Sequence, residues 1–378
     1  MKLGELVSIR KGKKPEAIVA TPGPGYRRLI QIDDLRSDAK PKFCPPARDE
    51  QVADPSDVII AWDGANAGTS SFGLAGVIGS TLAVLRPKNG GIDTSYLGHF
   101  VRSKRQYLRQ RCKGATVPHI ESRILKNLDL PMPPVAEQRR IAEILEQAEA
   151  LRAKRRTALT TLHSLTQALF SNLFGPIEPG TCRWPIQVLG KLISKNDKIN
   201  YGVVQPGDDH ADGIPLVRVG DFEGMSVNTS GLKRIAPRID AEYGRSRLHG
   251  EEVLLSCVGA TIGKVALATN GLKGFNIARA VARITAGESI DRLFLAHYLL
   301  TKPAQAFFRQ ETRAVGQPTL NITQIEETPV PVPPIGLQRE FGCRITALEK
   351  LKASHHASLA QMDALFTSLQ HRAFRGEL

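Results

Sequence analysis

The sequence has few cysteines and no long apolar segment. Its five cysteines, at positions 44, 112, 182, 257 and 343, are scattered and never form a C-x-x-C pair. This pattern argues against a disulfide framework and a structural zinc site, and favours a reducing compartment. The N-terminus has no apolar core typical of a signal peptide, and no apolar run approaches about 18 residues. We therefore expect a soluble, cytoplasmic protein.

Phosphate-binding and methyltransfer motifs are also missing. Gly259-Ala260-Thr261-Ile262-Gly263-Lys264 follows an apolar run, but three residues separate its glycines where a P-loop has four. Val265 stands where that loop needs a hydroxyl to hold magnesium. The glycines, repeated at Gly64 and Gly68, instead indicate a tight turn whose backbone closely approaches another segment. No Asn-Pro-Pro-aromatic or Asp-Pro-Pro-Tyr motif, which would hold a flipped base, occurs in the chain.

Acid–base and metal constellations are equally weak. The carboxylate pairs at 33–34, 208–209 and 251–252 lack nuclease-like spacing and are not shared between the two halves of the chain. His99 and His297 occupy matching positions, but neither has a Ser, Cys or Asp partner nearby in sequence, so we interpret them as packed core residues. We expect no catalytic residue, no metal and no cofactor in this chain.

The same sequence pattern occurs twice. Leu3-Gly4-Glu5-Leu6 returns as Leu189-Gly190-Lys191-Leu192, and Pro131–Arg139 returns as Pro331–Arg339. The offset between the copies is 186 residues at the first pair and 200 at the second. A repeat of this length indicates duplication of a whole domain with a helix, which gives one chain an approximate two-fold symmetry. Such a molecule suits a target that also has two halves.

The repeat predicts an α/β (α+β) architecture of two mixed domains and two long helices. We place the domains at residues 1–133 and 186–333, the helices at 134–174 and 334–378, and a Gly/Pro-rich linker at 175–185. Short β-branched runs predict strands at 28–32, 58–62, 81–85, 216–219, 253–258 and 280–284. Helical patterns at 94–112 and 291–313 precede the two proline-rich segments.

Both long helices carry apolar residues at alternating three- and four-residue spacing, which is typical of a coiled coil. The positions are Ile144, Leu151, Leu162, Leu165 and Leu169 in the first, and Leu348, Leu351, Met362, Leu365 and Leu369 in the second. Both seams weaken at matching points, Arg155 and Ala158 in one helix and His355 and Ser358 in the other. We expect an antiparallel pair that holds the domains at opposite ends; the alternative is that each helix packs only on its own domain.

A net charge of +14 favours a polyanionic partner, most commonly nucleic acid. Residues 102–113 contain six cations, which can neutralise phosphates, and adjoining polar residues can read base edges. The candidate DNA-binding residues in the first half are Lys11, Lys13, Lys14, Arg27, Arg28, Arg102, Lys104, Arg105, Arg109, Arg111, Lys113, Thr116 and His119. Those in the second half are Lys264, Arg309, Arg313, Gln317, Thr319 and Asn321. The alternative is a solvated basic surface.

The segment Leu130–Leu145, its partner at 330–345 and the stretch from Leu173-Phe174-Gly175-Pro176 to Leu192 resemble the specificity subunit of type I restriction–modification systems. The resemblance covers essentially the whole chain. It implies that each domain recognises one half of a split DNA sequence. It also implies that the helices, with Gln138, Arg139, Gln338 and Arg339, set the spacing and dock two modification subunits. These subunits would bind the methyl donor and methylate adenine, whereas restriction subunits would use ATP and Mg²⁺ to cleave DNA.

Two rival hypotheses remain at this stage. A self-sufficient methyltransferase or nuclease would need motifs that the sequence lacks. A coiled-coil adaptor that binds only proteins would show no salt-sensitive DNA affinity and would leave the basic charge unexplained.

Overall fold

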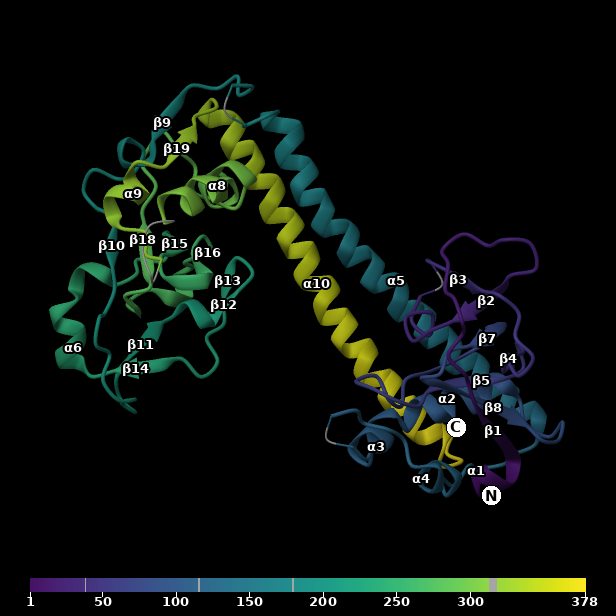
Figure 1. Ribbon diagram of the computed structural model, residues 1–378. Helices are drawn as coiled ribbons and strands as arrows, with labels where there is room; N and C mark the ends of the chain where they lie inside the picture. The colour runs from purple at the N-terminus through teal and green to yellow at the C-terminus, as the bar shows by residue number, and fades with distance from the viewer. Residues whose placement is uncertain (38, 115, 179, 313–317) are drawn as a thin grey trace. The chain divides into compact units, whose positions relative to one another are not determined.

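The computed structural model describes residues 1–378 except 38, 115, 179 and 313–317 (Figure 1). The chain packs as two compact units. The first comprises Met1–Ala158 and His355–Leu378, and the second comprises Leu159–Ser354. Each unit therefore contains one globular domain and a part of each long helix. In the described part of the chain, no helix is long and apolar enough to span a membrane.

The first domain contains two four-stranded sheets, ordered β1-β8-β5-β6 and β3-β2-β7-β4. Its strands are β1 (Val7–Lys11), β2 (Arg27–Ile30), β3 (Lys42–Cys44), β4 (Val52–Ala53), β5 (Val58–Ala61), β6 (Ser70–Phe72), β7 (Gly76–Ile78) and β8 (Leu82–Pro87). Its helices are α1 (Leu3–Leu6), α2 (Thr94–Ser103), α3 (Arg105–Gln110) and α4 (Ser122–Lys126). Every residue of β5 is buried, which makes this strand the centre of the core.

The second domain repeats the first sheet as β10-β18-β15-β16 and adds a three-stranded sheet, β14-β11-β17, with the pairs β12-β13 and β19-β9. Its strands are β9 (Ile186–Val188), β10 (Asn200–Tyr201), β11 (Ile214–Val217), β12 (Phe222–Glu223), β13 (Ser226–Val227), β14 (Lys233–Ile235), β15 (Val253–Ser256), β16 (Val265–Leu267), β17 (Asn276–Ile277), β18 (Val281–Ile284) and β19 (Pro329–Pro331). Its α-helices are α6 (Pro237–Glu242), α7 (Arg292–Leu299), α8 (Lys302–Glu311) and α9 (Ile322–Glu326). Its 3₁₀ turns are η1 (Leu189–Lys191), η2 (Val219–Asp221), η3 (Gly244–Ser246), η4 (Gly259–Thr261) and η5 (Asn270–Leu272).

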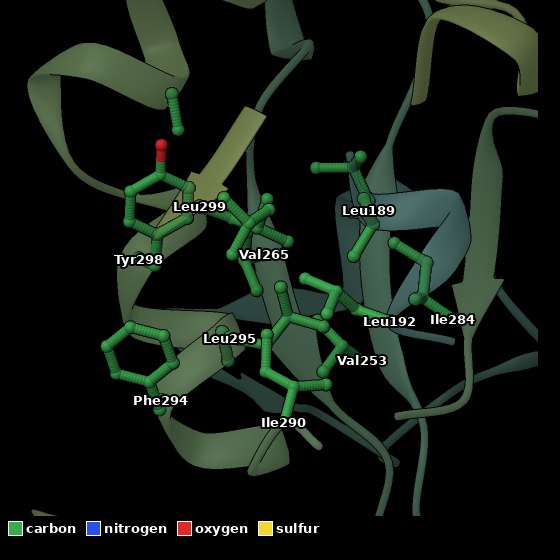
Figure 2. Close-up of a cluster of buried hydrophobic side chains, with 14 of the residues drawn as sticks. Leu189, Leu192, Val253, Val265, Ile284, Ile290, Phe294, Leu295, Tyr298 and Leu299 are labelled. Carbon is green, nitrogen blue, oxygen red and sulfur yellow. The ribbon is translucent and has the colours of Figure 1, made fainter. Parts of the chain in front are cut away.

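The duplicated sheets have the same register at their centres. Val58 on β5 pairs with Leu85 on β8, and the matching residue Val253 on β15 pairs with Ile284 on β18. Figure 2 shows Val253 and Ile284 in the second core, together with Phe294 and Leu295 of the helix that follows the sheet. The α+β class and the internal repeat are confirmed, and all six predicted strands are present with shifts of at most two residues.

Two predicted helices are each broken into two. The segment 94–112 forms α2 and α3, with Lys104 between them at φ −89° and ψ 3°. The helix predicted at 291–313 is replaced by α7 and α8, because Pro303, in the first turn of α8, cannot donate a backbone hydrogen bond to the preceding helix. The continuous basic helix expected at 102–113 is therefore wrong: its side chains belong to two helices and a loop.

The long helices α5 (Val135–Phe174) and α10 (Ile335–Ala373) contact each other in antiparallel fashion inside each unit. In the first unit, Arg155 contacts the His355 ring nitrogen at 3.0 Å, and Arg152 donates to Asp363 at 2.6 Å. In the second unit, Lys352 donates to the Thr166 hydroxyl at 2.8 Å. The antiparallel helix pair predicted from the sequence is confirmed.

The seam between the two helices differs from the predicted one: every second seam residue lies one position later in the sequence than predicted. Buried or partly buried residues on α5 fall at 145, 148, 152, 155, 159, 162, 166 and 169, and the matching residues of α10 lie 200 positions later. Leu162, Leu169, Leu348, Met362 and Leu369 belong to this seam. Ile144 is only partly buried beside it, and Leu151, Leu165, Leu351 and Leu365 are 46–59% exposed. The places that the sequence pattern assigned to these leucines are occupied by Arg152, Thr166, Lys352 and Phe366.

A phenylalanine at the C-terminal end of each long helix completes the core of one domain. Phe174 packs against Phe294 in the second unit, with ring centroids 4.7 Å apart. Phe374, 200 positions later, packs against Tyr96 and Phe100 in the first unit at 5.4 and 5.3 Å. Each domain thus depends on the end of a helix that begins after the other domain in the sequence.

Candidate nucleic-acid interface

A glycine turn and a short loop meet at one end of the first domain. The turn follows β5, and its Gly64 amide donates to the Pro118 carbonyl oxygen at 2.8 Å. The Ile120 amide donates to the Trp62 carbonyl at 3.0 Å, so two backbone hydrogen bonds join the loop to the turn. Lys113 and His119 close the loop through reciprocal backbone hydrogen bonds of 3.0 and 2.8 Å.

The second domain repeats this contact. The Gly259 amide donates to the Pro318 carbonyl at 2.9 Å, and the Leu320 amide donates to the Cys257 carbonyl at 2.9 Å. Thr319 forms a β-bridge to Val258, as His119 does to Asp63. We name each assembly a turn–loop platform: residues 62–69 with 113–114 and 116–120 in the first domain, and residues 257–264 with 318–320 in the second. The sequence interpretation of the glycines as a close approach of backbone is confirmed.

The turn requires glycine for two different reasons. Gly64 and Gly68 adopt φ angles of +87° and +89°, a region that residues with a Cβ atom disfavour. A Cβ at position 68 would also lie 3.1 Å from the Arg105 carbonyl oxygen. In the second domain, Gly263 has φ +86°, and a Cβ there would lie 2.4 Å from the Gln305 side chain.

Cations from separate segments hold the first platform. Arg109 on α3 donates to the Ala65 carbonyl oxygen of the turn, and Lys11 forms an ion pair of 2.6 Å with Asp63. Lys113 pairs with Glu121 beside the loop. Arg105, whose backbone lies against Gly68, has an exposed side chain. The structure therefore brings Lys11, Arg105, Arg109 and Lys113 to one place, next to the exposed residues Thr116 and His119.

Other predicted DNA-binding cations lie apart from this platform or face the protein. Arg102 pairs with Glu149 on α5 and lies over the Phe72 ring, with its side chain 27% exposed. Its assignment to the exposed basic surface is wrong, because α2 turns its guanidinium toward α5. Lys104 lies over Phe100 at 5.3 Å, and Arg111 stacks on Tyr107 at 3.9 Å with its side chain exposed.

The remaining basic residues of the first domain are on its loops and strand β2. Lys13 pairs with Asp49 at 3.3 Å and Lys14 is exposed. Arg27 pairs with Glu50, and Arg28 lies 3.9 Å from Asp34. A surface cation that is already ion-paired can bind a phosphate only if the phosphate replaces its carboxylate partner.

The second platform is held by uncharged side chains. Thr261 donates to the Val258 carbonyl at 2.9 Å, and Gln305 donates to the Gly263 carbonyl at 2.9 Å. Tyr201 donates to the Leu320 carbonyl at 2.6 Å. Burial raises the pKa of Tyr201 well above its ordinary value, so this phenol stays a hydrogen-bond donor. None of the three was predicted from sequence. Tyr201 and Gln305 lie far from the turn along the chain, and Thr261 resembles an ordinary polar surface residue.

The predicted residues of the second domain have different positions. Lys264, Arg309 and Thr319 are exposed at or near the platform. Asn321 caps helix α9, with its side-chain oxygen accepting from the Gln324 amide at 2.9 Å. That oxygen is therefore occupied by the cap, while the assignment of the exposed Asn321 as a base-reading residue stays a prediction. Arg313 and Gln317 lie outside the described residues.

The two matching histidines are packed in the domain cores. His99 is fully buried and meets Phe72 edge-on at 5.3 Å, and burial lowers its pKa. His297 meets Phe341 edge-on at 5.2 Å, and burial lowers its pKa to about 4. Both are neutral at physiological pH, as expected for packed core residues.

The carboxylate pairs serve the backbone. Asp34, Asp209 and Glu252 each accept a hydrogen bond from a nearby main-chain amide, and Glu252 also binds Arg283 at 3.2 Å. Among the described residues, no group of three or more His, Cys, Asp or Glu side chains is arranged to hold a metal ion.

A buried glutamine joins each long helix to its domain. Gln138 accepts from the Asp93 amide at 2.9 Å and donates to the Gly91 and Pro133 carbonyls at 3.1 and 2.9 Å. Gln338 accepts from the Asp291 amide at 2.8 Å and donates to the Ser289 and Pro333 carbonyls at 3.3 and 2.7 Å. Both glutamines are 0% exposed. Their assignment to a subunit-docking surface is wrong, because a buried and fully bonded side chain cannot contact another protein.

The neighbouring arginines are oriented differently. Arg139 is 68% exposed, with a loose ion pair of 3.8 Å to Asp93, and Arg339 is exposed on the matching turn of α10. These two residues remain candidates for contacts outside the chain.

The chain is similar to known proteins of one family. The family described as "Type I restriction modification DNA specificity domain" matches residues 1–161 and again 187–362. The chain is 28% identical over 352 residues to the type I restriction enzyme EcoBI specificity subunit of Escherichia coli, covering 86% of this chain and 74% of that protein. It is 22% identical to the EcoKI specificity subunit of E. coli K12, covering 97% of this chain and 90% of that protein.

Solved structures share the fold. The S subunit of a type I restriction–modification system from M. genitalium superposes with a TM-score of 0.62 at 15% identity, covering 99% of this chain and 95% of that one. A chain from a structural study of complex assembly in the type I system gives a TM-score of 0.58 at 20% identity, covering 100% and 97%. Since the family matches both halves of the sequence, the chain belongs to the type I restriction–modification specificity subunits, the proteins that recognise the DNA sequence in these systems.

Proposed function

We propose that each domain reads one half of a split DNA sequence through its turn–loop platform. The observation that supports this most strongly is the duplication of the platform. The Gly64 amide donates to the Pro118 carbonyl at 2.8 Å and the Gly259 amide donates to the Pro318 carbonyl at 2.9 Å, although the residues around these two contacts differ. A rigid backbone frame with variable side chains is the arrangement expected where two related domains read different base sequences.

Helices α5 and α10 fix the spacing between the half-sites in this proposal and dock two modification subunits, which bind the methyl donor and methylate adenine. Restriction subunits, which use ATP and Mg²⁺, join the complex to cleave DNA. Arg139 and Arg339 stand at the start of the two helices as exposed docking contacts.

Four exposed leucines supply the apolar part of the docking surface. Leu151 of α5 and Leu365 of α10 belong to the first unit and are 54% and 59% exposed. Leu165 and Leu351 belong to the second unit and are 49% and 46% exposed. All four occupy the same heptad position, directly before a seam residue. Equal positions on antiparallel helices lie along the same flank of the pair, so each unit presents one leucine pair, which we name the leucine flank.

The opposite flank of the helix pair is polar. Arg156 reaches Asp363 at 3.1 Å in the first unit, where it joins the Arg152–Asp363 pair. Apolar side chains gain roughly 1.5–3 kcal/mol each on full burial. A helix of a modification subunit is therefore expected on the leucine flank, with one such subunit for each unit of the chain.

Two measurements test this function. With the modification subunit present, single-molecule sequencing of methylated adenines should reveal one split, asymmetric motif. The double variant Leu151→Glu/Leu365→Glu should reduce the number of bound modification subunits from two to one, measured by native mass spectrometry. Leu300→Glu, at a 42% exposed leucine outside the long helices, is the matched control and should leave two bound. A continuous motif, or two bound subunits in the flank variant, contradicts the proposal.

A further inference from the structure

The loop of the first platform holds an aliphatic side chain out in solvent. Val117 is 57% exposed, although valine gains from burial wherever packing is available. Backbone hydrogen bonds flank it: the Lys113–His119 backbone pair closes the loop, and the Gly64 amide donates to the carbonyl of Pro118 next to it. Gly114 has φ +99°, and a Cβ there would lie 2.5 Å from the Val117 carbonyl oxygen. Val117 therefore lies in a loop that backbone hydrogen bonds close and attach to the glycine turn.

The surroundings of this valine are cationic. Lys113 is in the same loop, Arg109 binds the turn that the loop contacts, and Lys11 pairs with Asp63 of that turn. An isolated exposed apolar residue needs no explanation by itself. Here, however, it lies in a hydrogen-bonded loop beside cationic side chains, which favours nucleic acid over an apolar protein face as the surface that contacts it.

We propose that Val117 contacts the C5-methyl group of one thymine in the half-site read by the first domain. This inference rests on the proposed function and names one specificity-determining contact within it. The thymine methyl is the apolar group that the major groove displays, and small aliphatic side chains read it by direct contact. Side chains that wedge between base pairs in the minor groove are typically longer or bulkier, such as Phe, Leu, Ile or Met. The short, β-branched valine fits a methyl contact better than intercalation.

Deoxyuridine provides a direct probe because it lacks only the methyl group. Full-length protein, with its modification subunits, is titrated with cognate duplexes in which each thymine is replaced in turn by deoxyuridine. One position in one half-site should bind about fourfold more weakly, the value expected for a buried methyl group. In Val117→Ala, the cognate duplex should lose a similar factor, and the same deoxyuridine should have no further effect.

Val52→Ala is the matched control, since Val52 is a 42% exposed valine on the edge strand β4 of the same domain. It should leave the deoxyuridine effect unchanged. The inference is overturned if every deoxyuridine effect persists in Val117→Ala, or if neither half-site contains an A·T pair. Both results leave split-site recognition intact. The proposed function would instead be refuted if the wild-type protein showed no sequence preference at all.

Discussion

The two domains share a backbone platform but differ in the chemistry that holds it. In the first domain, Arg109 fastens the glycine turn, and Lys11 and Lys113 form ion pairs at its edges. In the second, Thr261 and Gln305 make the equivalent contacts. Residues 1–133 contain 21 Lys and Arg against 13 Asp and Glu, a net charge of +8; residues 186–333 contain 17 against 15, a net charge of +2. Duplication has thus preserved the frame, whereas the net positive charge is concentrated in the first domain.

The largest effect is expected from isolating the more basic domain. A fragment of residues 1–182 lacks Phe366 and Phe374, which complete its core. A second copy can supply Phe174, which lies 200 positions before Phe374 and so matches it in the repeat. We predict a two-fold homodimer that, with modification subunits, methylates a palindrome of the first half-site. Sedimentation and mapping of methylated adenines test this, and a monomer or retention of the asymmetric motif contradicts it.

Breaking α5 tests the frame that both domains share. Leu162→Pro removes a backbone donor in the helix interior and should cost about 3 kcal/mol or more. We expect lower unfolding free energy in urea titrations, together with loss of modification-subunit binding. Leu162→Ala keeps the backbone donor and should retain binding; unchanged methylation of the native motif by the proline variant would refute the role of the helices in spacing.

The buried glutamines should behave alike in the two copies, unlike the DNA contacts. Gln138→Leu and Gln338→Leu each leave a buried main-chain amide and two carbonyls without partners. A buried polar group that loses its partner costs about 1–3 kcal/mol, and water can replace some of the lost bonds. Each variant should therefore lower the free energy of unfolding by about 3 kcal/mol. Denaturant titration of both variants tests the symmetry, and a strongly unequal loss would show that the duplicated frame has diverged.

Salt dependence should distinguish the domains. Replacing Arg105, Arg109 and Arg111 together by Ala removes up to three phosphate contacts, and should reduce the slope of log affinity against log salt by about 2.7. Lys264→Ala/Arg309→Ala in the second domain should reduce it by about 1.8 at most. Fluorescence anisotropy at several salt concentrations gives both slopes. An unchanged slope in the first variant would show that α3 faces away from DNA.

Acid should destabilise the second unit through His297. Its pKa is lowered to about 4 in the folded chain, from an ordinary value of 6.5. The unfolded state therefore binds more protons between these values, so stability is fully present above about pH 6.5 and is lost as pH falls toward 4. The expected loss at pH 5 is about 2 kcal/mol relative to pH 7. His297→Leu should flatten this part of the pH–stability curve, while a Leu substitution at exposed His356 should not.

The sequence predicts the duplicated architecture well because each repeated motif and each strand pattern can be recognised within a short segment. It places the seam incorrectly because hydrophobicity favours Leu151 and Leu365 over Arg152. In the structure, Arg152 is 15% exposed on its side chain, lies over Phe366 at 4.2 Å and binds Asp363. Its aliphatic stem fills the seam while its charge is paired, an arrangement that an apolar–polar pattern does not reveal.

The candidate interface was only partly predictable. Glycine spacing indicates the turn, but nothing in the sequence pairs Gly64 with Pro118, more than fifty positions away. The break at Lys104 separates Arg102 from Arg105, so neighbouring cations in the sequence face different partners. Long-range pairing and helix breaks, which depend on tertiary packing, decide which basic residues reach the platform.

The most direct test of the central claim compares His119→Ala with Thr319→Ala, which change matching positions of the two platforms. Adenine methylation is mapped genome-wide for each variant with its modification subunits. The account predicts relaxed base preference in one half of the split motif for His119→Ala and in the other half for Thr319→Ala, with the spacing between halves unchanged. Changes in the same half for both variants, or in neither half, would contradict the assignment of one platform to each half-site.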